Sequence, residues 1–250
     1  MINYVMLTWN RQVFLSELFK SFYDNIENSD FNFFIVDNGS TDDTPNFLAK
    51  LSKNDNRFKV FFNNNNNGLE EYKKLLKMAV RAPGAYIVII DDDVLEFPKQ
   101  FDQRLINAMK VFPKVGFLAL DVVQNEYTNG AKPSPNLYTD EKREGIVISK
   151  GPAGGWCSIM RKEDYKKISF FTKFRKFDMS SGEDSNLVWF LRKILGKIPA
   201  ILKNEKCLHA SGPYYSKKYG YLERDIEKYD KSGLLEMRDL YISYRERKFT

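Results

Sequence analysis

The stretch Ala85-Tyr86-Ile87-Val88-Ile89-Ile90-Asp91-Asp92-Asp93 joins an apolar run directly to three carboxylates. The run is continuous rather than alternating, which is typical of a strand that is buried on both faces of a parallel sheet. In such sheets ligands bind beyond the carboxyl ends of the strands. The acidic triplet therefore predicts a functional site at that edge of the sheet.

Other apolar runs precede this stretch, and amphipathic segments separate them. The predicted strands are 4–8, 31–37, 58–62 and 85–90, and the predicted helices are 12–24, 44–51 and 69–82. This strand–helix alternation predicts an α/β fold with a mostly parallel, Rossmann-like central sheet flanked by helices. Polar residues follow each strand, which adds candidate ligands to the same edge.

The second half of the chain is less regular. Helices are predicted at 99–111 and from Asp184 to about 195, strands at 117–123, 145–149 and 198–202, and a polar loop at 126–140. Residues 214–250 carry Tyr and Leu at helical spacing among many charges, which predicts amphipathic helices. We expect one domain over residues 1–212, followed by a helical extension over residues 213–250 that folds back on it.

Composition excludes several classes of protein. The chain has 250 residues, of which 43% are hydrophobic, so it has too much to bury for a disordered tail. Its longest apolar run, 85–90, is far shorter than the roughly 20 residues of a membrane-spanning helix. The N-terminus lacks the pattern of a signal peptide, and Cys157 and Cys207 are too few for a disulfide framework. We expect a cytoplasmic protein with reduced cysteines.

Positive charge is concentrated in one segment. The net charge is +6, and the segment 161–178 alone has seven basic and three acidic residues. Such a patch fits an anionic partner, whether nucleic acid, membrane surface or substrate, and it also fits a solvated helix face. No recognisable nucleic-acid-binding motif accompanies the patch, so we expect no nucleic-acid partner.

Three groups of residues could carry chemistry, and each has a structural alternative. The carboxylates Asp91-Asp92-Asp93 repel one another, so they either bind a cation or form a solvated turn. Glu183 and Asp184 precede an apolar helical segment, where they either cap the helix or accept a proton. His209, the only histidine, is either structural or a metal ligand.

Together these residues resemble glycosyltransferase family 2, whose members share the GT-A fold. The resemblance covers most of residues 4–212. The matching segments are 5–11, which contains Thr8-Trp9-Asn10-Arg11, then 36–44, Asn67-Gly68, the Asp-x-Asp motif within 89–93, 153–161, and Gly182-Glu183-Asp184, with His209 after them. Each match is weak alone, but their shared order is specific. One departure is Leu69-Glu70-Glu71-Tyr72 after Gly68, where the family often has Gly, Ala, Arg and Asn.

The resemblance implies a role for each matching residue. Asp91, Asp93 and His209 would hold a divalent metal, Mn²⁺ or Mg²⁺. Asp184 would be the general base, and Glu183 would position the acceptor hydroxyl or the base. The residues implied at the nucleotide and donor site are Thr8, Asn10, Arg11, Asp37, Asn67, Gly68, Asp91, Asp92, Gly154, Gly155 and Trp156. Among these, Asp37 would bind the nucleobase edge, and Trp156 would offer a flat face to a sugar ring.

The implied function is metal-dependent, inverting transfer of a sugar from a nucleotide-sugar to a hydroxyl group. UDP is the expected carrier because the family uses it widely. The acceptor would be a glycan, a lipid-linked glycan or another glycoconjugate in polysaccharide biosynthesis, and the basic patch would touch the inner face of an anionic membrane.

Two alternatives remain open. The first is a non-catalytic nucleotide- or glycan-binding relative. The second is a sugar-nucleotide pyrophosphorylase, whose glycine-rich motif should follow the first strand, where this chain instead has Thr8-Trp9-Asn10-Arg11.

Overall fold

Strands and helices alternate through the first part of the chain. The computed structural model describes residues 1–128, 132–180 and 182–247. Its first elements are β1 (Ile2–Thr8), α1 (Gln12–Asn25), β2 (Phe31–Asp37), α2 (Thr44–Asn54), β3 (Phe58–Phe62), the short 3₁₀ helix η1 (Gly68–Glu70), α3 (Glu71–Arg81) and β4 (Tyr86–Ile90). The predicted order is confirmed, and β2 and β3 have the predicted bounds.

The second part of the chain contains strands that no continuous apolar run predicts. Its elements are β5 (Val94–Glu96), α4 (Phe101–Val111), β6 (Val115–Val122), η2 (Pro135–Leu137), β7 (Thr139–Arg143), β8 (Ile146–Lys150), β9 (Cys157–Arg161), α5 (Lys162–Ile168), η3 (Phe171–Phe174), α6 (Glu183–Leu195) and β10 (Ile198–His209). The strand predicted at 198–202 continues to His209, because its pairing with β6 resumes after an irregularity between Leu202 and Lys206.

The prediction of a loop over 126–140 was wrong at its end, where β7 begins. Every residue of β7 is polar, so no hydrophobic pattern marks it as a strand. The strand forms because it pairs antiparallel with β8, with Arg143 opposite Ile146. Glu144 and Gly145 connect the two strands with φ angles of 48° and 78°, as the tight turn of a β-hairpin requires. Residues 129–131 of the predicted loop lie outside the described residues.

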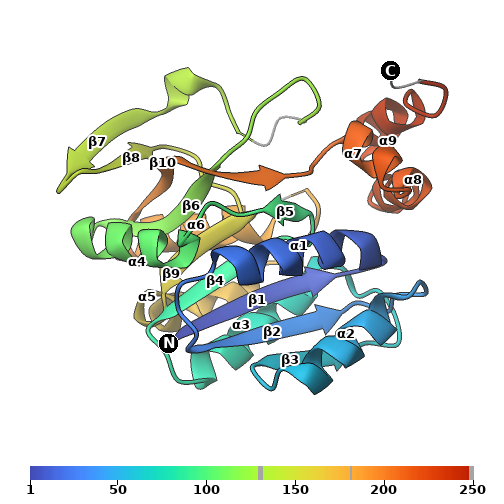
Figure 1. The fold of residues 1–250 in the computed structure, drawn as a ribbon. Coiled ribbons are helices and arrows are strands. Elements are labelled where there is room, and N and C mark those ends of the chain that lie inside the picture. Colours follow the sequence, from blue (N-terminus) through green and yellow to red (C-terminus); the bar gives the residue numbers. More distant parts are fainter. Residues whose placement is uncertain (129–131, 181, 248–250) are drawn as a thin grey trace.

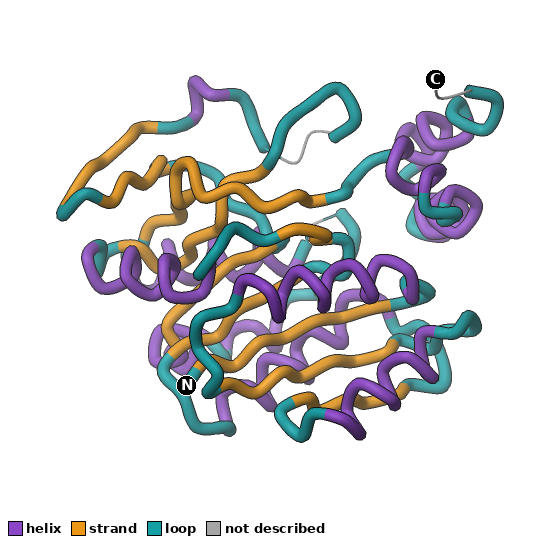
Figure 2. The backbone as a smooth tube through the Cα atoms, viewed as in Figure 1, coloured by secondary structure: helices purple, strands orange, loops and turns teal. Residues whose placement is uncertain are grey.

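The strands form one large sheet, which Figure 2 shows in orange. Their order is β3-β2-β1-β4-β9-β6-β10-β8-β7, and β5 pairs with the end of β10. Strands β1 to β4 are mutually parallel, and so are β6 and β10. Because β4 and β6 both run antiparallel to β9, they point the same way. The predicted mostly parallel sheet is therefore confirmed, with β9 inserted against its direction.

Helices cover both faces of this sheet (Figure 1). α1, α2 and α4 pack on one face, and α3, α5 and α6 pack on the other. The alternation of β1 shows why both faces must be apolar, since Tyr4 and Met6 belong to the first core and Val5 belongs to the second. This is the burial that the continuous apolar runs predict.

The C-terminal segment is helical, as predicted. It consists of α7 (Pro213–Lys218), α8 (Leu222–Lys231) and α9 (Leu235–Ile242), on the side toward which β1 and β2 point (Figure 1). Phe14 of α1 packs against the rings of Tyr219 and Tyr221, with centroid distances of 4.9 and 4.8 Å. A domain boundary at residue 212 stays a prediction, and residues 248–250 lie outside the described part.

Both cysteines are buried and neither forms a disulfide. Burial raises the pKa of the Cys157 and Cys207 thiols, so both are held in the unreactive thiol form. Among the described residues, no helix combines the length and the apolar composition that crossing a membrane requires.

Candidate functional site

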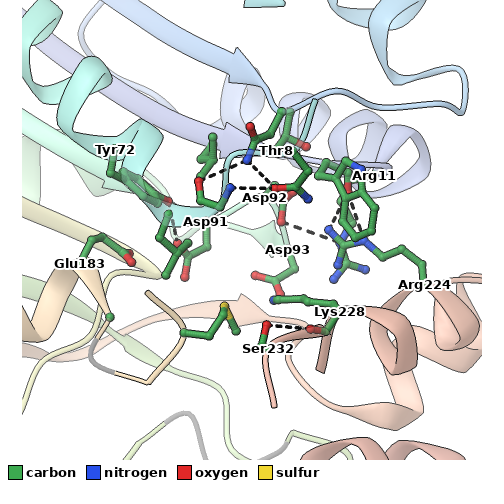
Figure 3. A pocket seen from close by; sticks show the side chains of 18 of the residues that line it. Thr8, Arg11, Tyr72, Asp91, Asp92, Asp93, Glu183, Arg224, Lys228 and Ser232 are labelled. Atoms are coloured by element: carbon green, nitrogen blue, oxygen red, sulfur yellow. Dashed lines mark hydrogen bonds and ion pairs between the residues drawn. The ribbon is translucent and has the colours of Figure 1, made fainter. Parts of the chain in front are cut away.

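A cavity of about 620 Å³ lies at the carboxyl edge of the parallel strands (Figure 3). Residues that follow β1 and β4, the start of α6 and one side of α8 form its walls. The predicted site residues that line it are Thr8, Arg11, Gly68, Asp91, Asp92, Asp93, Glu183 and Asp184. Segments from both halves of the chain therefore meet in one cavity.

The pairing of β5 with β10 brings His209 to the acidic triplet. β4 ends at Ile90, so Asp91 is the first residue beyond the buried strand. β5 then pairs antiparallel with the end of β10, which sets His209 opposite Val94. The backbone N–H of Ala210 also donates to the carbonyl oxygen of Asp93, over 2.8 Å. Backbone structure thus fixes the distance between the triplet and the imidazole.

Asp91, Asp93 and His209 form a cluster in which one ligand atom from each lies within 4.8 Å of the others. Nε2 of His209 is 2.9 Å from Oδ1 of Asp93 and 3.8 Å from Oδ2 of Asp91. Two carboxylates and one imidazole are a donor set that suits Mn²⁺ well and Mg²⁺ acceptably. The residues present therefore fit the divalent metal that the sequence implies.

The electrostatics of the cluster also favour a cation. Burial raises the pKa of Asp91 to about 7, and the nearby charge of Asp93 adds to the rise. Burial acts in the same direction on Asp93, but the adjacent His209 outweighs it and holds that pKa below its usual range. Burial would lower the pKa of His209, and Asp93 raises it instead. Crowded, desolvated carboxylates gain most from a bound positive charge.

Glu183 and Asp184 occupy the first turn of α6, where the helix dipole favours negative charge. Oδ2 of Asp184 accepts a hydrogen bond from the backbone N–H of Gly155 over 3.0 Å, and Oδ1 accepts one from Ser185 over 2.5 Å. Glu183 is buried, and burial raises its pKa well above the usual range, with Asp91 and Asp184 adding to the rise. The two neighbouring carboxyl groups therefore have different environments.

The side chains of Glu183 and Asp184 leave little room for a side chain at position 155. A Cβ atom at this position would lie 3.0 Å from Oε1 of Glu183 and 3.5 Å from Cβ of Asp184. A Cβ atom at Gly154 would collide with the indole of Trp156. Both glycines therefore allow the segment that connects β8 to β9 to approach α6 and the indole closely, although neither glycine lines the cavity.

Trp156 lies behind the cavity rather than in its wall. Its side chain is 5% exposed, and its indole N–H donates to the carbonyl oxygen of Leu120 over 2.9 Å. The indole centroid is 6.0 Å from that of His209. The indole packs beside the cluster of Asp91, Asp93 and His209. Its flat face, which was expected to contact a sugar ring, is not exposed in the cavity.

Three more of the predicted donor residues contact the turn after β2, and none of them lines the cavity. Asp37 is 2% exposed and accepts a hydrogen bond from the backbone N–H of Ser40 over 3.3 Å. Oδ1 of Asn10 accepts one from the backbone of Thr41 over 2.7 Å. Asn67 donates from its backbone to Oδ1 of Asn38 over 3.0 Å. Asn38 itself does line the cavity, although the sequence analysis did not select it.

α8 contributes cavity residues that the sequence analysis missed. Arg224, Lys228, Lys231 and Ser232 line the cavity from the C-terminal segment. Figure 3 shows Arg224 and Lys228 reaching toward the acidic triplet. Nε of Arg224 donates to the carbonyl oxygen of Trp9 over 3.1 Å, which holds α8 against the end of β1. Their amphipathic pattern predicted a helix, but no motif marked them as part of a site.

Arg11 connects the triplet to α8. Its side chain is buried, with Nη2 3.0 Å from Oδ1 of Asp225 and Nε 3.8 Å from Oδ1 of Asp92. The guanidinium lies 4.8 Å from the ring centroids of both Phe14 and Tyr221. Burial opposes its charge, but Asp225 and Asp92 outweigh that effect and raise the pKa of Arg11. Its place between two carboxylates suggests a structural role beside the implied donor contact.

Removing the Asp225 carboxylate is expected to destabilise the protein strongly. Asp225→Ala leaves the buried charge of Arg11 without its closest partner, which costs about 3–5 kcal/mol in the free energy of unfolding. Urea unfolding at pH 7 measures this cost. Burial would raise the pKa of Asp225, but Arg11 and Arg224 outweigh it and lower that pKa. The difference between wild type and variant should therefore shrink as pH falls through the lowered pKa.

Glu223→Ala on the same helix is the matched control. Its exposed carboxylate pairs with Arg245 at 2.5 Å, and such surface pairs contribute about 0–1 kcal/mol. Equal destabilisation by the two substitutions would contradict the role of Asp225.

Comparison with known proteins places the chain in a family. A profile of Glycosyl transferase family 2 matches residues 4–169. A GalNAc(5)-diNAcBac-PP-undecaprenol beta-1,3-glucosyltransferase from Campylobacter jejuni is 33% identical over an alignment of 104 residues that covers 37% of this chain and 29% of that relative. The chain thus aligns with less than a third of this relative.

Solved structures agree on the fold. A mannosyltransferase from Pyrobaculum calidifontis, in complex with GDP-Man and Mn²⁺, has a TM-score of 0.61 at 17% identity and covers 100% of this chain and 65% of its own. S. aureus TarS 1-349 in complex with UDP-GlcNAc has a TM-score of 0.59 at 16% identity, covering 89% and 63%. Since the family profile spans β1 to α5, well over half of the sequence, the chain belongs to glycosyltransferase family 2 and has the GT-A fold.

Proposed function

We propose that the chain transfers a sugar from a nucleotide-sugar, with UDP as the carrier, to a hydroxyl group of a glycan, with inversion at the anomeric carbon. The observation that carries the proposal is a single cavity lined both by Asp91 and Asp93, the carboxylates that cluster with His209, and by Glu183 and Asp184. Sugar transfer needs both groups of residues. A metal held by the first group would neutralise the leaving diphosphate, and the second group would accept the proton of the acceptor.

The diphosphate of the donor would lie between the triplet and α8. When bound to Asp91, Asp93 and His209, Mn²⁺ or Mg²⁺ would act as a Lewis acid on the diphosphate oxygens. Arg224 and Lys228 line the same cavity, so they would add positive charge where negative charge develops on the leaving group. The mannosyltransferase and TarS structures, which are complexes with GDP-Man and UDP-GlcNAc, support this donor class.

The nucleoside would occupy the side of the cavity that Thr8, Asn38 and Gly68 line. Asp37 would act there through the turn that it stabilises rather than through direct exposure, since it is buried beneath Ser40. Arg11 would hold Asp92 in place for the donor, because its guanidinium lies between that carboxylate and Asp225.

Asp184 would be the general base, and Glu183 would position the acceptor. Two backbone N–H groups donate to the oxygens of Asp184 and orient its side chain, and other lone pairs of these oxygens remain for a substrate proton. Burial raises the pKa of Glu183, and a protonated carboxyl group suits a hydrogen bond to a hydroxyl group better than proton removal. Direct proton transfer to Asp184 is compatible with a single in-line displacement.

The acceptor would be a lipid-linked glycan. This part of the proposal rests on the name of the Campylobacter relative, which describes a glycan on undecaprenol diphosphate. A second hollow of about 730 Å³ lies beside α6 and β8, and it is lined in part by Lys150, Trp189 and Arg192. Cationic and aromatic side chains are suitable partners for a diphosphate-linked sugar.

The test is release of nucleoside diphosphate by the full chain. The donors would be UDP-Glc, UDP-Gal, UDP-GlcNAc, UDP-GalNAc and GDP-Man, each with Mn²⁺ and with or without a polyprenyl-diphosphate-linked glycan. We expect one UDP-sugar to release UDP, faster with the acceptor, and we expect EDTA to stop release until excess Mn²⁺ restores it. A chain that binds UDP but releases none from any donor would be a non-catalytic relative.

A further inference from the structure

We propose that η3 and the adjoining faces of α5 and α6 form a docking surface for an anionic lipid membrane. Phe170, Phe171 and Phe174 are 58%, 41% and 73% exposed, although they occur within five consecutive positions. Single exposed apolar residues are common on protein surfaces, but a cluster of large aromatic rings marks an interaction site. Here it is named the phenylalanine cluster.

The three rings form one continuous apolar surface. The centroid of Phe170 lies 5.6 Å from that of Phe171 and 5.3 Å from that of Phe174. Phe171 is also 6.5 Å from Phe190, a core residue of α6, so the cluster is anchored to the body of the protein. Trp189, the neighbour of Phe190, is 40% exposed and extends the aromatic surface along α6.

Cations surround the aromatic rings. The guanidinium of Arg175 lies 4.2 Å from the ring centroid of Trp189, and Nζ of Lys173 lies 5.6 Å from that of Phe170. Lys166 and Lys167 are exposed on α5, which packs against α6. Aromatic rings at the headgroup level with basic side chains around them are the pattern of proteins that bind the surface of an anionic bilayer.

Acidic residues do not cancel this charge. The segment 161–178 has seven basic and three acidic residues. One of the acids, Asp164, is 5% exposed and is already paired with Arg161 at 3.6 Å and with Lys197 at 3.5 Å. The charged groups that face outward are therefore mostly positive, which complements anionic headgroups.

Docking at this surface would bring a lipid-linked acceptor close to the site, and this step rests on the proposed function. α6 begins with Glu183 and Asp184 and continues to Trp189 and Arg192. The second hollow, which Trp189 and Arg192 line, reaches Ser185, the residue after Asp184. Membrane contact through the phenylalanine cluster would therefore present a lipid-linked acceptor to α6 from the bilayer side.

The experiment is co-sedimentation of the full chain with vesicles, which requires no catalytic activity. The vesicles are phosphatidylcholine alone, or phosphatidylcholine with about 30% phosphatidylglycerol, where each basic residue near the surface contributes to binding. We expect binding to the anionic vesicles that weakens as salt is added. Phe170→Ser/Phe174→Ser and Lys166→Glu/Lys167→Glu should each lower the partition coefficient by about ten-fold or more.

Two matched controls should bind like wild type. Phe62→Ser removes a 49% exposed phenylalanine from β3, an edge strand of the sheet. Lys50→Glu/Lys53→Glu reverses two exposed charges on α2. Circular dichroism and thermal unfolding should be unchanged in every variant, which shows that each one folds.

Three outcomes would overturn the proposal. The first is a wild-type chain that does not sediment with anionic vesicles at physiological salt. The second is a phenylalanine variant that binds as well as wild type. The third is a wild-type dimer that Phe170→Ser/Phe174→Ser converts to a monomer without a change in vesicle binding, because the surface would then join copies of the chain. Since no sugar transfer is measured, each outcome is independent of the proposed function.

Discussion

Asp184→Asn is expected to lower sugar transfer by at least about 100-fold, because general-base assistance is typically worth about 10²–10⁴-fold. The affinity for UDP should stay within a few-fold of wild type. The asparagine oxygen can still accept the hydrogen bond from Gly155, and the amide gives up only the one from Ser185, so the start of α6 should keep its position. What the amide lacks is the basicity to take a proton. Initial rates with saturating donor, together with calorimetric titration of UDP, measure the two quantities.

Glu183→Gln is the matched control at the neighbouring position. Glutamine keeps the size of Glu183 and can still hydrogen-bond to the acceptor, so transfer should fall only mildly. If Glu183→Gln abolished transfer while Asp184→Asn left it nearly intact, the base would be Glu183. If both variants stayed active, Glu183 and Asp184 would only cap α6, and the base would lie elsewhere.

Asp93→Ala is expected to remove metal-dependent transfer. A bound divalent ion supplies several kcal/mol of charge stabilisation in the transition state, which corresponds to a loss of roughly 1000-fold. The affinity for UDP should then no longer rise when Mn²⁺ is added, and it should match that of wild type in EDTA. Calorimetric titrations of UDP with Mn²⁺ and with EDTA test this directly.

His209→Ala and Asp43→Ala complete the comparison. His209 is 2.9 Å from the Asp93 carboxylate, so its loss should also weaken the response of UDP affinity to Mn²⁺. Asp43 is an exposed carboxylate before α2 and should be silent. An unchanged Mn²⁺ response in His209→Ala would mean that the histidine is structural, as a hydrogen-bonded partner of Asp93.

Local pattern predicted the first half of the fold because each strand there is a short apolar run with a polar end. The second half depends on contacts between distant segments. β9 fits between β4 and β6 through antiparallel pairing, and β7 exists only because β8 lies beside it. In β10, Asn204 has a φ of 71°, and this irregularity divides an apolar start from a polar continuation. Periodicity in a single segment carries no information about such partners.

The candidate site shows the same division. Asp91, Asp93, Glu183 and Asp184 could be predicted because each stands at the end of a strand or the start of a helix, where its backbone position is set locally. His209 lies beside Asp91 and Asp93 because β5 pairs with β10, and that pairing was not predicted. Arg224 and Lys228 were missed because an amphipathic pattern predicts which face of a helix packs, but not what its other face covers.

The inserted strand β9 also matters while the chain is being synthesised. β4 has one neighbour, β1, that is made before it, and another, β9, that begins at Cys157. At about 5–20 residues per second, the roughly 70 residues between them take several seconds to emerge from a ribosome. Throughout that time the uncharged run Tyr86–Ile90 has an open edge of backbone N–H and C=O groups. Such an edge can pair with another nascent chain, so these seconds are when a chaperone would protect the protein most.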